Sequence, residues 1–198
     1  EHAHVVRAGA VEALLRGLFG ASAAELPASV RELIVKRAGG NPFYVEEIVR
    51  GLVADGVLVQ DGDRWRCRAD AALADVPVTV QGLILSRLDR LPAGARQLAQ
   101  EAAVVGPEFE GRLLGRVAGD PTGCEAGLAL LEAAGLIRPV PDPAEPRYAF
   151  SHALVQEAIY QNLLVRRRTE LHGRVGRALE DLRGGDAAAA RLEDLEAL

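Results

Sequence analysis

A run of turn-forming residues, GGNP at positions 39–42, constrains this chain most strongly because it interrupts two helical patterns. Residues 27–38 and 42–55 each place apolar side chains on one helical face. Glycine enters the left-handed backbone region at little cost and therefore ends helices well. Asn41 is suited to cap the next helix, and Pro42 to occupy its first position, where a missing N–H costs nothing. The sequence predicts a sharp helix–turn–helix corner.

The stretch that follows the second helix favours strands. Residues 56–67, GVLVQDGDRWRC, place apolar and aromatic residues on both sides of a DGD turn, which is typical of a small hairpin. A further short helical pattern covers residues 11–19. We therefore expect residues 1–68 to form a helical subdomain with a small hairpin.

The middle of the chain combines helices with two strands. Helical patterns cover residues 78–91, 93–105, 108–118 and 122–134. Strand patterns follow at residues 136–140 and 147–150, joined by the proline-rich link PDPAEP. The last three of these helices, followed by a two-stranded ribbon, have the order of a winged helix. We assign a winged helix to residues 69–160.

The C-terminal part is helical again from Ser151 onward, and the tail at residues 186–198 is expected to form one more helix. Paired helices of this kind suggest that residues 161–198 begin a TPR-like helical array. The predicted fold class is mainly α, with a helical subdomain, a winged helix carrying a small β-ribbon, and the start of this array.

Composition argues against several classes of protein. The net charge of −5 gives no global basic field that would attract nucleic acid or an anionic membrane. No apolar run approaches the roughly 18 residues of a membrane span, and the N-terminus lacks the order of a signal peptide. Cys67 and Cys124 form no CxxC pair, so we interpret them as buried thiols and expect a cytoplasmic location. Because the chain lacks methionine and begins at Glu1, we expect a segment of a longer protein.

The motifs of autonomous enzymes do not occur in the sequence. It contains no GxxxxGK[ST] loop, no HExxH, no GxSxG and no clustered metal ligands. Lys36 precedes its glycines rather than following them, which is the wrong order for a phosphate-binding loop. We assign no catalytic residue and no metal ligand, and do not expect the isolated chain to be catalytic.

A winged helix raises the possibility of DNA binding. The helix that would enter the major groove, at residues 121–136, offers Glu125 and Glu132 but no arginine or lysine. Base readout relies heavily on arginine, lysine, asparagine and glutamine, and affinity relies on neutralised phosphates. We therefore expect no DNA partner. The basic cluster at residues 165–174 is interpreted as a solvated face, with a dedicated partner-binding patch as the alternative.

His152 lies where a strand pattern gives way to a helical one, in YAFSHALVQEAIY at residues 148–160. A histidine at such a junction can donate a hydrogen bond to an anion beside the backbone N–H groups of the helix. The same position also suits a capping or packing residue. The residue pattern alone leaves both roles open.

Four motifs, taken in order, resemble the STAND class of signal-transduction ATPases over residues 5–180. The nearest likeness is to bacterial AAA-type ATPase modules that follow class III adenylate/guanylate cyclase domains or accompany LuxR-type regulators. The motifs are GNPFYVEEIVRGLVADGVL, VPVTVQGLILSRLDRL, YAFSHALVQEAIYQNLL and RRRTELHGRV. This resemblance implies that residues 1–68 are a helical lid.

The resemblance also implies an ATP/ADP site. Gly40, Asn41 and Pro42 match a lid corner whose proline packs against the adenine. His152 matches a winged-helix histidine that contacts the β-phosphate of ADP and holds a closed resting state. Ala153 replaces the aspartate of the Met-His-Asp form of this motif. The Walker motifs would precede Glu1, so residues outside this chain would complete the site.

The implied function is to couple the ATP/ADP state to conformational signalling in a larger protein. The implied partners are an upstream nucleotide-binding domain, a cyclase or other effector domain, and proteins that bind the helical repeats, with no membrane involved. The alternatives are a DNA-binding winged-helix regulator and a purely structural interaction module. We assign no role to Arg87 or to the Arg166–Arg168 cluster.

Overall fold

The structure of the protein is a computed structural model that describes residues 2–20, 23, 26–61, 64–67, 79–141 and 146–196. The described residues are mainly helical with small antiparallel sheets, which confirms the mainly α fold class. The chain divides into two compact units, Glu1–Ser86 and Arg87–Leu198. No helix among the described residues combines the length and apolar character needed to cross a membrane.

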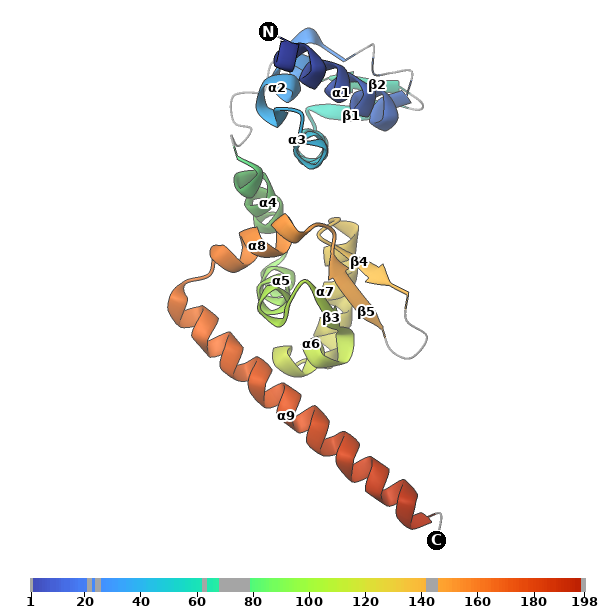
Figure 1. The fold of residues 1–198 in the computed structure, drawn as a ribbon, viewed down its shortest axis with the longest axis vertical. Helices are drawn as coiled ribbons and strands as arrows, with labels where there is room; N and C mark the ends of the chain where they lie inside the picture. The colour runs from blue at the N-terminus through green and yellow to red at the C-terminus, as the bar shows by residue number, and fades with distance from the viewer. Residues whose placement is uncertain are drawn as a thin grey trace. The chain divides into compact units, whose positions relative to one another are not determined.

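The first unit packs three helices against a hairpin (Figure 1). The elements are α1 (His2–Phe19), α2 (Ala28–Ala38), α3 (Pro42–Ala54), β1 (Leu58–Asp61) and β2 (Arg64–Cys67). The expected hairpin is confirmed, with Leu58 opposite Cys67 and Asp61 opposite Arg64. Gly62 and Asp63 of the expected turn lie outside the described residues.

One apolar core holds the first unit together. Its buried side chains include Val11, Leu15, Val30, Ile34, Val45, Ile48, Leu52 and Leu58. Phe19 packs edge-on against Trp65 of the hairpin, with 5.2 Å between ring centroids. Arg31 of α2 bonds Glu12 of α1 at 2.9 Å and the Ala23 carbonyl at 2.7 Å. Apolar burial thus joins the elements, and Arg31 fixes the pairing of the first two helices.

The second unit contains a winged helix. Helix α4 (Val80–Asp89) leads into it across the boundary between the units. The unit continues with α5 (Ala93–Val105), β3 (Glu108–Glu110), α6 (Gly111–Ala118), α7 (Pro121–Ala133), β4 (Ile137–Val140) and β5 (Arg147–Phe150). The strands form one antiparallel sheet in the order β3-β5-β4. This order of helices and strands is that of a winged helix.

Strand β3 corrects the sequence analysis, which predicted helix throughout residues 108–118. Phe109 is 2% exposed, and its ring lies 6.0 Å from that of Tyr148 and 5.9 Å from that of Phe150. Pairing with β5 satisfies the backbone groups of this three-residue segment. Burial of one aromatic side chain against a distant strand therefore outweighs the local helical pattern.

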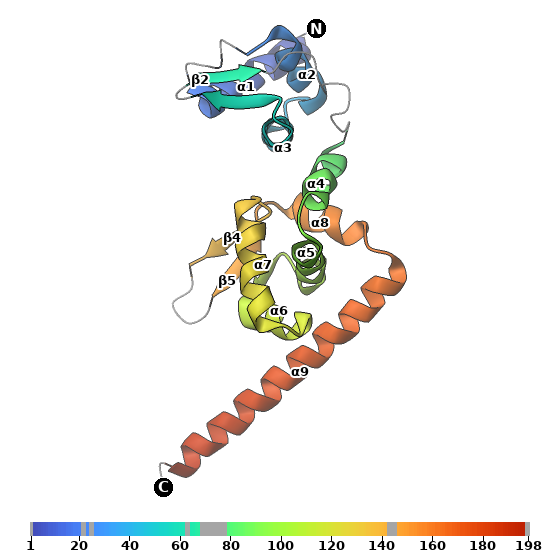
Figure 2. The ribbon, with the colours of Figure 1, turned by 180° about the vertical axis from the view of Figure 1, so that it is seen from behind.

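Two helices complete the second unit, α8 (Ala153–Gln161) and α9 (Val165–Glu196). The separate tail helix that we expected is wrong, because residues 186–196 continue α9 as one helix of 32 residues. No proline stops this helix, and Gly184 and Gly185 remain helical within it. Viewed from behind, α9 runs past α5 and α6 (Figure 2).

The first half of α9 packs onto the winged helix through one apolar stripe. The stripe consists of Leu171, Val175, Ala178 and Leu182, at the spacing of one helical face. It meets Val104 of α5 together with Leu113 and Val117 of α6 in a single buried cluster. Helix α9 therefore shares a core with the winged helix.

Candidate functional site

The first part of the candidate site is the corner between α2 and α3. The structure contains the helix–turn–helix corner that the sequence predicted. Gly39 caps α2 in the left-handed conformation at φ 57°, and Gly40 follows at φ 87°. Asn41 then caps α3, since its side-chain oxygen accepts a hydrogen bond from the Phe43 N–H at 3.1 Å. Pro42 occupies the first turn of α3. The local rules that predicted the corner therefore account for its geometry.

The tip of this corner faces solvent. Asn41 and Pro42 are both exposed, whereas Val45 in the next turn is fully buried. The backbone of Asn41 is fixed on both sides, because its N–H donates to the Ala38 carbonyl at 2.9 Å and its carbonyl accepts from Val45 at 3.1 Å. An exposed proline on a rigid turn offers a flat apolar surface that could pack against a planar ligand.

Charged and polar groups surround the start of α3. Glu47 is 2% exposed and pairs with Arg50, with 3.1 Å between Oε1 and Nη1. Arg50 also reaches Glu46, with 3.5 Å between Nη2 and Oε2. Burial raises the pKa of Tyr44, and the positive charge of Arg37 partly opposes that shift. Glu46 and Glu47 of α3 thus share one arginine.

The second part of the candidate site is the N-terminus of α8. His152 is the exposed N-cap residue in extended conformation, at φ −151° and ψ 148°. Its Nδ1 accepts a hydrogen bond from the Leu154 N–H at 3.1 Å. An imidazole nitrogen that accepts a hydrogen bond carries no proton, so in the neutral ring the proton lies on Nε2. His152 therefore caps the helix with one nitrogen and carries a donor on the other.

The position of His152 is set by the elements on both sides of it. The Ser151 N–H donates to the Leu136 carbonyl at 3.0 Å, which joins the end of β5 to the residue before β4. Gln156 of α8 donates to the Ala103 carbonyl of α5 at 2.7 Å, and Val155 and Ile159 are buried. Strand and helix therefore hold the histidine at a fixed junction.

The residues assigned to the nucleotide lie on two different units. Gly40, Asn41 and Pro42 belong to the first unit and His152 to the second. We therefore describe the geometry of the corner and that of His152 separately. Both parts share one property, which is that the side chains expected to meet a ligand are exposed while the backbone beneath them is hydrogen bonded.

Helix α7, which occupies the position of a DNA-reading helix, has an acidic and apolar outer surface. Its buried side is formed by Cys124, Leu128 and Leu131. Its exposed side carries Glu125 and Glu132, and the helix contains no arginine or lysine. Such a surface repels phosphates, whereas small apolar residues between the glutamates suit contact with protein.

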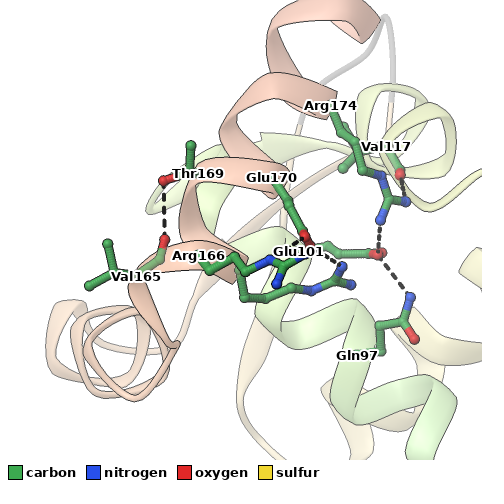
Figure 3. Close-up of polar contacts among 9 residues, drawn as sticks. Gln97, Glu101, Val117, Val165, Arg166, Thr169, Glu170 and Arg174 are labelled. Atoms are coloured by element: carbon green, nitrogen blue, oxygen red, sulfur yellow. Dashed lines mark hydrogen bonds and ion pairs between the residues drawn. The ribbon is translucent and has the colours of Figure 1, made fainter.

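The basic cluster at residues 165–174 contains an interaction that sequence analysis did not find. Arg174 pairs with Glu101 of α5, with 3.0 Å between Nη1 and Oε1, and its other nitrogen donates to the Val117 carbonyl of α6 (Figure 3). Gln97 donates to the same Glu101 oxygen at 3.0 Å. A carboxylate on the buried face of α5, next to Leu98, was the signal that a cation must come from elsewhere in the fold.

The other arginines of this cluster have partners on or near α9. Arg166 and Arg167 both reach Glu170, at 3.6 and 3.2 Å. Arg168 lies 5.2 Å from the centre of the Tyr160 ring. The cluster is thus partly a solvated face, as interpreted from the sequence, and partly the anchor of α9.

Comparison with known proteins finds a similarity to a much longer protein. The curated Uncharacterized protein R02095 of Rhizobium meliloti (strain 1021) is 32% identical over 150 residues. The match covers 74% of this chain and 14% of the relative, so the chain spans a small part of that protein's length. No protein family profile and no solved structure matches. The name of the relative states no activity, and the similarity brings no function to this chain.

Proposed function

We propose that this chain is the regulatory lid and winged-helix segment of a STAND-type ATPase, which couples the ATP/ADP state to conformational signalling in a larger cytoplasmic protein. An upstream nucleotide-binding domain in the same polypeptide would complete the site. In this proposal, Gly40, Asn41 and Pro42 contact the adenine, and His152 contacts the β-phosphate of ADP.

The observation that carries the proposal is the hydrogen bond from the Leu154 N–H to His152 Nδ1. This bond selects the ring form whose Nε2 is a donor, and it places that donor beside the positive end of α8. A phosphate oxygen can accept a hydrogen bond from Nε2 and is also attracted by the backbone N–H groups at the start of α8. The residues present thus fit the diphosphate end of ADP.

The corner supports the adenine end of the same proposal. Pro42 is exposed on a turn whose backbone is fixed, so it can pack against a flat ring without a further loss of conformational entropy. Neither contact requires this chain to perform chemistry. The chain would act by contacting ADP through the corner and through His152, and the loss of one contact would shift the balance toward an open state.

The charge on α7 favours this function over DNA binding. Glu125 and Glu132 on its exposed side would oppose entry into the major groove. Contacts with other domains of the same protein would then replace the DNA contacts of a winged-helix regulator. A purely structural module remains the alternative, since the corner and the cap of α8 would exist without a ligand.

Substitution of His152 separates capping from phosphate binding. Serine is a good N-cap residue but cannot extend a donor as far as Nε2, so His152→Ser should keep the helix while removing the phosphate contact. In the full-length protein we expect ADP affinity, measured by calorimetry, to fall about tenfold or more, as expected for a charge-assisted hydrogen bond. His172→Ala, at another exposed histidine, is the control and should bind ADP normally. Equal ADP affinity in wild type and His152→Ser would refute the proposal.

A further inference from the structure

A groove in the second unit is not used by the proposed nucleotide contacts. It has a volume of about 480 Å³ and lies between α6, the first half of α7 and β5. Its walls include Gly111 and Gly115 of α6, Cys124 and Leu128 of α7, and Tyr148 of β5. Ligand pockets in proteins measure about 300–1,000 Å³ and are mostly apolar with a few polar groups. The groove falls within both limits.

Two glycines one helical turn apart help to form the wall. A Cβ atom on Gly115 would lie 3.7 Å from the Pro121 Cα and 3.9 Å from the Cys124 sulfur. A Cβ atom on Gly111 would lie 3.4 Å from the Tyr148 ring. Side chains at these two positions would therefore occupy space beside α7 and β5. Because glycine has no side chain, the groove can extend to the backbone of α6 at these two positions.

Three charged residues line the groove, Arg112 and Arg116 of α6 and Glu125 of α7. Arg116 also lines a second groove of about 320 Å³, together with Arg174 and Arg177 of α9. Among the described residues, Arg116 and Arg177 make no hydrogen bond or ion pair, whereas Arg174 is engaged by Glu101. Asp181 is the carboxylate of this second groove. An apolar groove and an arginine-rich groove thus meet at one side chain.

The geometry points to a binding site for a small amphipathic anion, with an aliphatic or aromatic body in the apolar groove and one carboxylate at Arg116 and Arg177. Arg116 and Arg177 line one groove with Arg174, so cationic groups outnumber the single carboxylate of Asp181 there, and this excess of positive charge attracts an anion. Glu125 lines the apolar groove on the side of α7, which directs the head group toward α6 instead. The site involves neither His152 nor the corner, so it is independent of the proposed nucleotide function.

Decanoate is a suitable probe because it combines a ten-carbon chain with one carboxylate, and decanol is its neutral counterpart. In calorimetry on the full chain, we expect decanoate to bind at least tenfold more tightly than decanol. Arg116→Glu and Arg177→Glu should each weaken decanoate binding about tenfold or more and leave decanol binding unchanged. Arg138→Glu, at an exposed arginine of β4 that lines neither groove, is the matched control and should behave like wild type.

Protection of Cys124 locates the bound chain. In a Cys67→Ser background, decanoate should slow alkylation of Cys124, which lines the apolar groove and is 4% exposed. Absence of decanoate binding at millimolar concentration would overturn the inference. So would equal affinity for decanoate and decanol, decanoate binding unaffected by Arg116→Glu, or alkylation of Cys124 that proceeds equally fast with decanoate present.

Discussion

Glu101 and Arg174 form an ion pair across the second unit, with 3.0 Å between Oε1 and Nη1, although 73 positions separate them in the chain. The Glu101 side chain is 2% exposed, and the Arg174 side chain is 29% exposed. Gln97 and the Val117 carbonyl satisfy further groups of the pair. Helix α9 is thereby fixed to α5 and α6 by a polar contact in addition to the apolar stripe.

Removing one partner of this pair should be costly, because the other charge would stay buried. We expect Arg174→Ala to lower the free energy of unfolding by about 3–5 kcal/mol. Urea denaturation measures this change. Arg166→Ala, whose side chain is 92% exposed, is the control and should change stability by less than about 0.5 kcal/mol. A loss below about 1 kcal/mol for Arg174→Ala would show that the pair does not anchor α9.

Phe109 should be the main determinant of β3. The side chain is 2% exposed and contacts two rings of β5. Truncation to alanine leaves a cavity, so Phe109→Ala should destabilise the protein by about 3–5 kcal/mol. Phe109→Leu fills more of the cavity and should cost less. Equal unfolding midpoints for Phe109→Ala and the wild-type protein would contradict this assignment.

Gly39 should be required for its backbone conformation alone. Its φ is 57°, and an added Cβ atom would meet nothing within 4 Å. Gly39→Ala should therefore cost about 1–2 kcal/mol through left-handed strain. Gly39→Asn should cost less, because asparagine tolerates this region better. Thermal unfolding of both variants distinguishes strain from a packing effect, which would make the larger asparagine the worse substitution.

Cys124 should react slowly near neutral pH. Burial, together with smaller contributions from the negative charges of Glu101, Glu125 and Asp120, raises the pKa of its thiol from 9.0 to about 11. Because the raised pKa favours the protonated thiol in the folded state, its contribution to stability is present below pH 9 and is lost as the pH rises toward 11. The rate of alkylation should increase about tenfold per pH unit across that range. An alkylation rate that levels off near pH 9 would show that the fold does not raise the pKa of this thiol.

The parts of the fold that depend on local chemistry could be predicted from the sequence. The corner from Gly39 to Pro42 follows from neighbouring residues, and the structure adds only the hydrogen bond of Asn41. Helix α5 was likewise expected at residues 93–105, where the structure has it.

The parts that depend on distant partners could not be predicted. Strand β3 forms because Phe109 packs against β5, and the residues next to Phe109 in the sequence do not predict that contact. The charge of Arg174 looked like one of several surface arginines until the fold brought it to Glu101. His152 was left open between capping and anion binding, and the structure shows that it caps α8 through Nδ1. The cap uses Nδ1, whereas the proposed phosphate contact uses Nε2.

Hydrogen–deuterium exchange on the full-length protein tests most directly whether one nucleotide contacts both units. During an ADP titration, we expect slower exchange at residues 41–45 and at residues 153–156, with the same midpoint for both segments. The amides of α9 at residues 171–182 serve as an internal control and should not follow that midpoint. Protection of only one segment, or of neither at saturating ADP, would contradict the account.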